Sequence, residues 1–272
     1  MKAEIICIGT ELLLGEIVDT NASYLSQVLA GLGIDLYYKL TVGDNLERAI
    51  ATLKQAWERS DLLLLSGGLG PTQDDLTREA IAGMLGEEQV LNEAAMTEVA
   101  AWFRKSGREM PGNNRRQAMF PTSAEPITNR WGTAPGVWVE KDGKILAAMP
   151  GVPLELHKLM EEEIIPRLKR HLGTNHPILV SRTLRAIGIG ESALEERIED
   201  LINTQSDVTI APYAKRGEVH LRLAVKAITT EEGSRKIEPV EAAVRKRLDG
   251  YIFGCNSSGS RRLRRTESTT GT

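Results

Sequence analysis

A run of four leucines, three closely spaced glycines and two aspartates is the stretch of this sequence best suited to chemistry. Leu62–Leu65 predicts a buried strand of a parallel sheet. The glycine loop, residues 66–70, reads Ser-Gly-Gly-Leu-Gly, and glycines let a backbone turn tightly and approach a ligand closely. A helix is favoured from Arg78 to Leu85, and its positive dipole end would face the loop. The sequence therefore predicts an anion site between strand and helix.

Asp74 and Asp75, which follow the glycine loop, indicate which kind of anion it binds. The pattern is neither the dinucleotide fingerprint nor the P-loop, because no lysine follows the glycines. A carboxylate beside a phosphate repels it unless a cation lies between them. We therefore expect a phosphate held together with Mg²⁺ or another divalent cation.

Alternating strand and helix patterns place this loop in a larger fold. Strands are expected at 4–8, 34–42 and 61–65, and helices at 22–32, 46–59 and from 78. Such alternation predicts an α/β fold with a doubly wound, mostly parallel sheet and right-handed crossovers.

In such sheets ligands bind beyond the carboxyl ends of the strands. Three loops should therefore converge there, at 9–11, 43–45 and 66–70. Asp44 and Asp75 are the expected metal ligands, and Glu11 or Asp74 the base that takes a proton from water. For any one of these acids, the alternative is a solvated loop residue or a helix cap.

Later segments add candidates. Asn114 and Arg115 have side chains that suit phosphate and sugar, although a helix cap with a solvated basic turn explains them as well. A hairpin with an Asp142-Gly143 turn is expected over 137–149, and Pro150-Gly151 then turns into a helix over 154–170.

Residues 178–254 predict a separate α+β module with the order βαββα(β), and 255–272 a disordered basic tail. The order resembles KH topology, but no G-x-x-G loop is present. A net charge of −3 and an aromatic content of 4% also argue against nucleic acid as a partner. Two distant cysteines indicate a reducing, cytoplasmic setting, and no apolar run reaches membrane-spanning length.

Several of these motifs occur together and in order, and together they resemble the CinA family of bacterial competence/damage-inducible proteins. They are Gly9–Gly15, Asn21, Val42–Asn45, Ser66–Thr77, Asn113–Ala118, Gly132–Gly136 and Met149–Pro153.

The resemblance implies that residues 1–172 share the molybdopterin-binding fold of the MogA, MoaB and MoeA proteins, and that 178–254 form the family's KH-type domain. It implies Mg²⁺-dependent hydrolysis of ADP-ribose to AMP and ribose 5-phosphate, by a homodimer with no membrane partner. The substrate-binding residues expected on this basis are Gly9, Thr10, Asn21, Ser66, Gly67, Gly68, Gly70, Thr72, Asn114, Arg115, Pro150 and Gly151.

The sequence departs from the family pattern after residue 254. Most members continue into a nicotinamide mononucleotide amidase domain, which residues 266–272 echo only faintly, with Thr269 where a cysteine is expected. Amidase activity is therefore not expected, and we interpret the ending as a truncated or frameshifted reading frame. Two alternative functions stay open: a molybdopterin-binding or adenylylating protein, and a non-enzymatic nucleotide or nucleic-acid adaptor.

Overall fold

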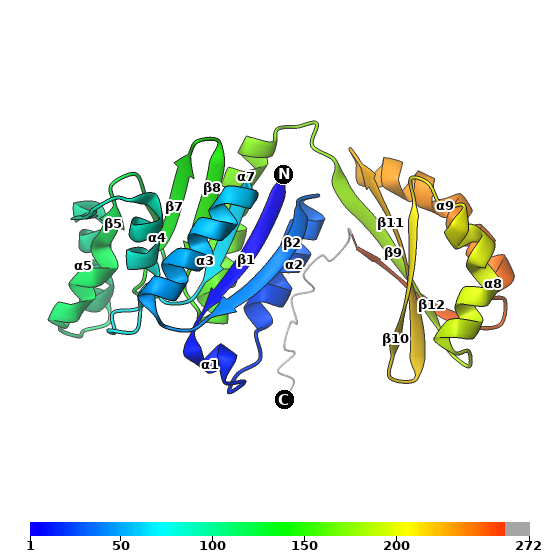
Figure 1. The fold of residues 1–272 in the computed structure, drawn as a ribbon, viewed down its shortest axis with the longest axis horizontal. Helices are drawn as coiled ribbons and strands as arrows, with labels where there is room; N and C mark the ends of the chain where they lie inside the picture. Colours follow the sequence, from blue (N-terminus) through cyan, green and yellow to red (C-terminus); the bar gives the residue numbers. More distant parts are fainter. Residues whose placement is uncertain (259–272) are drawn as a thin grey trace, which may run out of the picture. The chain divides into compact units, whose positions relative to one another are not determined.

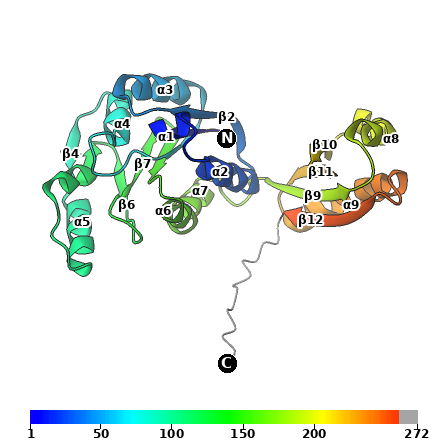
Figure 2. The same ribbon diagram turned by 90° about the horizontal axis from the view of Figure 1, so that it is seen from below.

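The computed structural model describes residues 1–258, which fall into two compact units. The first unit contains residues 1–30 and 34–174, and the second contains 31–33 and the chain from 175. Figure 1 and Figure 2 show the elements of each unit in two views. Within residues 1–258, every helix is too short or too polar to cross a lipid bilayer.

The first unit is built on a six-stranded sheet with the order β2-β1-β3-β8-β7-β6. Four neighbouring strands are parallel: β2 (Asp35–Val42), β1 (Lys2–Ile8), β3 (Leu62–Ser66) and β8 (Lys144–Met149). The antiparallel strands β7 (Gly136–Lys141) and β6 (Glu125–Ile127) complete one edge. The predicted hairpin joins β7 to β8, and the doubly wound, mostly parallel fold is confirmed.

Helices cover both faces of this sheet (Figure 2). The helices α3 (Leu46–Arg59) and α4 (Thr77–Leu85) lie on one face. The other face carries α2 (Thr20–Gly31), α6 (Pro153–Leu159) and α7 (Ile165–Leu172), the last two joined by a π-helical turn, Met160–Ile164. Between α4 and β6 the chain forms β4 (Gln89–Leu91), α5 (Glu93–Lys105), a 3₁₀ helix η1 (Gly112–Ala118) and β5 (Met119–Pro121).

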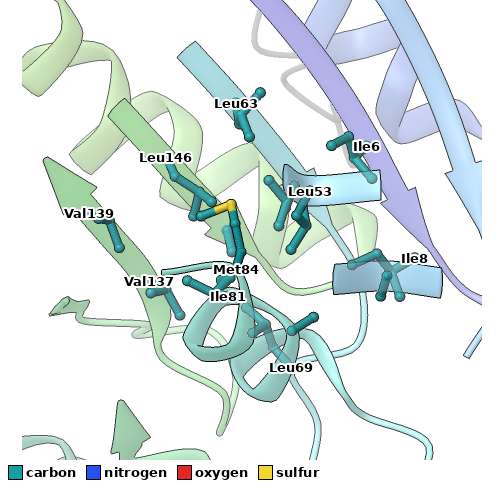
Figure 3. Packing of buried hydrophobic residues seen from close by; sticks show 14 of the residues in the cluster. Ile6, Ile8, Leu53, Leu63, Leu69, Ile81, Met84, Val137, Val139 and Leu146 are labelled. Carbon is teal, nitrogen blue, oxygen red and sulfur yellow. The ribbon is translucent and has the colours of Figure 1, made fainter. Parts of the chain in front are cut away.

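The leucine run forms a central strand in the core of the first unit. All four leucines of β3 are fully buried, because β3 has a strand on each side and helices on each face. Leu63 points to the α3 and α4 side, where it joins Ile6, Leu53, Ile81 and Leu146 (Figure 3). Each buried leucine side chain contributes about 1.5–3 kcal/mol, so this cluster fixes the strand ends from which the loops emerge.

The second unit is a four-stranded antiparallel sheet with two helices, as expected. Its elements are β9 (Ile178–Ala186), α8 (Glu191–Asn203), β10 (Thr209–Lys215), β11 (Glu218–Ala227), α9 (Thr230–Arg247) and β12 (Ile252–Ser258). The strand order β10-β11-β9-β12 is that of a split βαβ, or ferredoxin-like, arrangement.

One boundary expected from the sequence is wrong. Residues 255–258 were assigned to the tail by their polar composition, yet they pair with β9 as the end of β12. Backbone hydrogen bonds to a neighbouring strand hold them there, and a composition argument cannot detect such pairing. The rest of that segment, 259–272, lies outside the described residues.

Candidate active site

A cleft of about 600 Å³ opens at the carboxyl ends of β1, β3 and β8. The chain runs from β1 to β2 on one side, whereas from β3 it continues toward β7 and β8 on the other side. The cleft therefore lies between β1 and β3, where the strand order reverses, as in other doubly wound sheets. Most of the predicted residues line it: Gly9, Glu11, Asn21, Asp44, Ser66, Gly67, Gly68, Gly70, Thr72, Asp74, Asp75, Pro150 and Gly151. Thr10, Asn114 and Arg115 do not.

Two glycines of the loop adopt a backbone conformation that other residues avoid. Gly67 has φ 100° and Gly68 has φ 64°. A Cβ at Gly67 would lie 2.2 Å from the Ile8 carbonyl oxygen, and one at Gly68 would lie 2.3 Å from Thr77 Oγ1. Both glycines are therefore required by conformation and by space.

Of the four N–H groups of residues 67–70, one is used and three are not. Gly67 N donates to the Met149 carbonyl at 3.0 Å, so our expectation that it would cradle a phosphate is wrong. This bond exists because β8 lies beside β3. The N–H groups of Gly68, Leu69 and Gly70 have no acceptor among residues 1–258. They are the donors that remain for an anion.

Two side chains from the start of α4 hold the loop in place. Buried Thr77 donates its Oγ1 proton to the Gly67 carbonyl at 2.7 Å. Arg78, 3% exposed, donates to the Leu69 carbonyl at 2.9 Å and to the Pro135 carbonyl at 3.2 Å. Burial lowers the pKa of Arg78 to about 10. The guanidinium remains charged at neutral pH, and it places a buried cation directly behind the loop.

Asp44 is held at the cleft by a reciprocal clamp. Thr10 N donates to Asp44 Oδ2 at 2.9 Å, and Asp44 N donates to Thr10 Oγ1 at 3.1 Å. The predicted role of Thr10 as a substrate ligand is therefore corrected: it ties the end of β1 to the turn after β2. Asp44 Oδ1 has no partner among the described residues.

Asp75 is held in the same way by its own turn. Its Oδ2 accepts hydrogen bonds from Thr72 N at 2.8 Å and from Thr72 Oγ1. Arg116 secures this turn from outside, because it donates to the carbonyls of Thr72 and Asp75 and pairs with Glu79 at 2.7 Å. Asp75 therefore also presents a second oxygen, Oδ1, that has no partner within residues 1–258.

The two aspartates are the candidate ligands for a cation, because both belong to the cleft lining. Within residues 1–258, no three acidic, histidine or cysteine side chains gather closely enough to hold a metal by themselves. Mg²⁺ is usually bound by one or two carboxylates, with phosphate oxygens and waters completing the shell. Asp44 and Asp75, each with one carboxylate oxygen tied and one available, supply that kind of ligand set.

The two candidate bases reach the same cleft from different loops. Glu11 opens α1 (Thr10–Leu13) and folds back over Gly9, where a Cβ would lie 2.6 Å from Glu11 Oε1. Asp74 is exposed on the turn after the glycine loop. The structure brings both carboxylates to the lining, so the choice between them stays open.

Asn21 reaches the cleft because a different residue caps its helix. Asp19 Oδ1 accepts from Ala22 N at 2.8 Å in the first turn of α2. Asn21 Nδ2 is thereby left to donate to Ser66 Oγ at 3.0 Å and to the Gly151 carbonyl at 2.8 Å. Asn21 joins the ends of β3 and β8, and its Oδ1 is buried without a partner.

The η1 helix changes which residues of the Asn-Asn-Arg-Arg-Gln segment face the cleft. Residues three apart in a 3₁₀ helix share a side, so Asn114 and Gln117 are both buried and Arg115 is exposed. Asn114 Nδ2 turns back to the Pro111 carbonyl at 3.3 Å. Neither Asn114 nor Arg115, which were expected to contact phosphate or ribose, lines the cleft, whereas Gln117 does.

Glu155 is a second residue that sequence reasoning missed. It lies in the first turn of α6 and lines the cleft. Asn129 Nδ2 donates to Glu155 Oε2 at 2.6 Å. Burial raises the pKa of Glu155, and the hydrogen bond from Asn129 opposes this rise. The three-residue repeat of a 3₁₀ helix could have placed Gln117 on the same side as Asn114. No local sequence pattern, in contrast, marks Glu155 as a residue of the cleft.

Comparison with known proteins places this geometry in a family. Residues 4–170 match the family described as "Probable molybdopterin binding domain", and 181–254 match "Damage-inducible protein CinA KH domain". A competence-damage inducible protein of Symbiobacterium thermophilum is 49% identical over 255 residues, 93% of this chain and 60% of that protein. A CinA-like protein of Dictyoglomus thermophilum is 46% identical over 254 residues, 93% of this chain and 61% of that protein.

Among solved structures, CinA from Thermoplasma acidophilum is 34% identical, with a TM-score of 0.57, over 61% of this chain and 96% of that one. The chain spans about 60% of the length of the curated relatives it matches. The family resemblance seen in the motifs is thereby confirmed: this chain belongs to the CinA family.

Proposed function

We propose that the cleft hydrolyses the diphosphate of ADP-ribose to AMP and ribose 5-phosphate with the help of a divalent cation. One observation carries the proposal: the three unpaired N–H groups of residues 68–70 and the untied oxygens of Asp44 and Asp75 line the same cleft. Donors of this kind suit phosphate oxygens, and the carboxylates suit a cation bound to them. The volume of about 600 Å³ lies within the range of ligand pockets, about 300–1,000 Å³.

Different residues of the cleft have different roles in the proposed reaction. Residues 68–70 bind one phosphate, and the buried guanidinium of Arg78 favours its charge. A divalent cation held by Asp44 and Asp75 would neutralise phosphate oxygens. Glu11 or Asp74 takes a proton from water as the water oxygen bonds to one phosphorus. The bridging P–O bond breaks, and the bridging oxygen leaves with the other phosphate.

The test is AMP release from ADP-ribose, measured chromatographically with Mg²⁺ and with a chelator. We expect Asp75→Asn to lower turnover about 100-fold or more, as for other removed electrostatic stabilisers. Asp142→Asn is the matched control, because Asp142 lies in the β7–β8 hairpin turn and not in the cleft lining. If Asp75→Asn retains full turnover, the metal role assigned to Asp75 is refuted. Glu11→Gln and Asp74→Asn, assayed separately, identify the base.

A second candidate function is the binding or adenylylation of molybdopterin, which the family match of residues 4–170 favours. It is distinguished by measuring the binding of molybdopterin itself, and the release of pyrophosphate when molybdopterin is supplied with ATP and Mg²⁺. Saturable binding of molybdopterin without AMP release from ADP-ribose would favour the second candidate.

A further inference from the structure

Residues of the cleft lining leave both hydrogen-bond donors and hydrogen-bond acceptors unpaired within residues 1–258. The glycine loop supplies unpaired N–H groups, whereas Gln117 and Glu155 supply oxygens. Gln117 is 0% exposed, donates from Nε2 to Thr133 Oγ1 at 3.2 Å, and leaves Oε1 buried without a partner within residues 1–258. A buried polar oxygen without a partner is destabilising, because the hydrogen bond that it would make with water is not replaced. Such an oxygen at a cleft wall indicates a ligand group that pairs with it.

The orientation of the Glu155 carboxylate is fixed by its neighbours. Asn129 Oδ1 accepts from Trp131 N at 3.0 Å and from Gly132 N at 3.1 Å, so its Nδ2 must point the other way. That Nδ2 holds Glu155 Oε2, and Oε1 has no partner among the described residues. Glu155 therefore presents an acceptor to the cleft.

One loop contacts both side chains. Glu155 lies against Gly132, where a Cβ would be 2.0 Å from Oε2, and Gln117 holds the next residue, Thr133. Consecutive Cα atoms are about 3.8 Å apart, so both side chains converge on the same short piece of backbone. Ala134 and Pro153, which are close in sequence to Thr133 and Glu155, add apolar surface to the lining.

We infer that Gln117 and Glu155 bind the exocyclic amino group of an aromatic nitrogen heterocycle. An amino group of this kind donates two hydrogen bonds and accepts none, which matches two acceptors whose neighbouring donors are already used. A sugar hydroxyl has one proton to donate and would leave one of the two acceptors unpaired, and a keto oxygen would face two acceptors. For the substrate proposed above this group is the 6-amino group of adenine, an assignment that rests on the proposed function.

The test is calorimetric binding of three probes without metal: AMP, the same nucleotide without its amino group (purine riboside 5′-monophosphate), and inosine 5′-monophosphate with a keto oxygen there. We expect the wild type to bind AMP at least about ten-fold more tightly than the other two. Gln117→Leu should remove most of that preference. Glu155→Gln turns an acceptor into a donor, so it should weaken AMP and strengthen the inosine nucleotide.

Gln89→Leu is the matched control, because Gln89 also has a buried amide atom without a partner but lies in β4, outside the cleft lining. It should bind all three probes like the wild type. A loosened fold would weaken all three probes together, whereas lost recognition changes their ratio.

Equal binding of AMP and the nucleotide without an amino group by the wild type overturns the inference, and so does the absence of AMP binding. The outcome is separate from hydrolysis, since no probe contains a diphosphate. If ADP-ribose is not hydrolysed and the AMP preference depends on Gln117 and Glu155, the inference stands and the proposed function fails. If ADP-ribose is hydrolysed without any base preference, the inference fails and the hydrolase stands.

Discussion

Replacement of Gly68 by alanine tests how tightly the glycine loop is specified. Gly68 and Gly86 have nearly the same backbone angle, φ 64° and 68°, but only Gly68 has a close neighbour. An alanine in this left-handed region costs about 1–2 kcal/mol, which is the whole cost expected for Gly86→Ala. At Gly68 the new Cβ would also lie 2.3 Å from Thr77 Oγ1.

Thr77 must then give up its bond to the Gly67 carbonyl, at a further cost of about 1–3 kcal/mol for a buried oxygen left unpaired. Gly68→Ala should therefore destabilise the first unit by about 2–5 kcal/mol, against a total stability that is commonly about 5–15 kcal/mol. Urea unfolding followed by tryptophan fluorescence measures this unit alone, because all four tryptophans, 57, 102, 131 and 138, belong to it.

A double-mutant cycle with Thr77→Ala separates the two costs. Removing Oγ1 removes the clash, and the lost bond is counted only once in the Gly68→Ala, Thr77→Ala double variant. This variant should therefore be more stable than the sum of the single changes predicts, by about 1–3 kcal/mol. The reasoning is refuted if Gly68→Ala costs no more than Gly86→Ala, or if the two substitutions are additive.

Two further predictions concern other parts of the chain. The hydrogen bond from Arg185, and then that from His220, lower the pKa of Glu218 to about 2. This stabilisation is complete above the ordinary glutamate pKa of 4.5 and is lost as the pH falls toward 2. Glu218→Gln should therefore make the stability of the second unit depend less on pH in acid, which acid unfolding followed by circular dichroism measures. An unchanged unfolding curve would contradict the pairing. Burial raises the pKa of the Cys7 thiol, whereas Cys255 is exposed. A thiol reagent at pH 8 should therefore modify Cys255 first and Cys7 only after unfolding. Rapid modification of Cys7 would show that β1 opens in the native state.

The sequence predicts features that depend on local pattern. The strand and helix order, the leucine strand and the glycine turn follow from periodicity and from backbone preferences. Asp44 and Asp75 could be placed together because strand ends in a parallel sheet share an edge.

The missed features depend on contacts between distant segments. The Gly67 N–H is used because Met149 reaches it from β8, a neighbour no local pattern reveals. Gln117 faces the cleft because η1 repeats every three residues, and Glu155 is oriented by Asn129 from another loop. In each case the residue type was informative but its partner was not predictable.

The position of β8 also has a consequence for synthesis of the protein on the ribosome. Once residues 1–85 have left the ribosome, β1, β2, β3 and α4 can all form. The edge of β3 that later pairs with β8 is then still open, because Ile145, the partner of Leu62, has not yet been synthesised. Contacts between such distant residues form slowly, and an unpaired apolar edge strand attracts other chains. We therefore expect the nascent chain to be most prone to aggregation until the segment containing Met149 has left the exit tunnel. Only then can the Gly67 N–H of the glycine loop find its acceptor, the Met149 carbonyl.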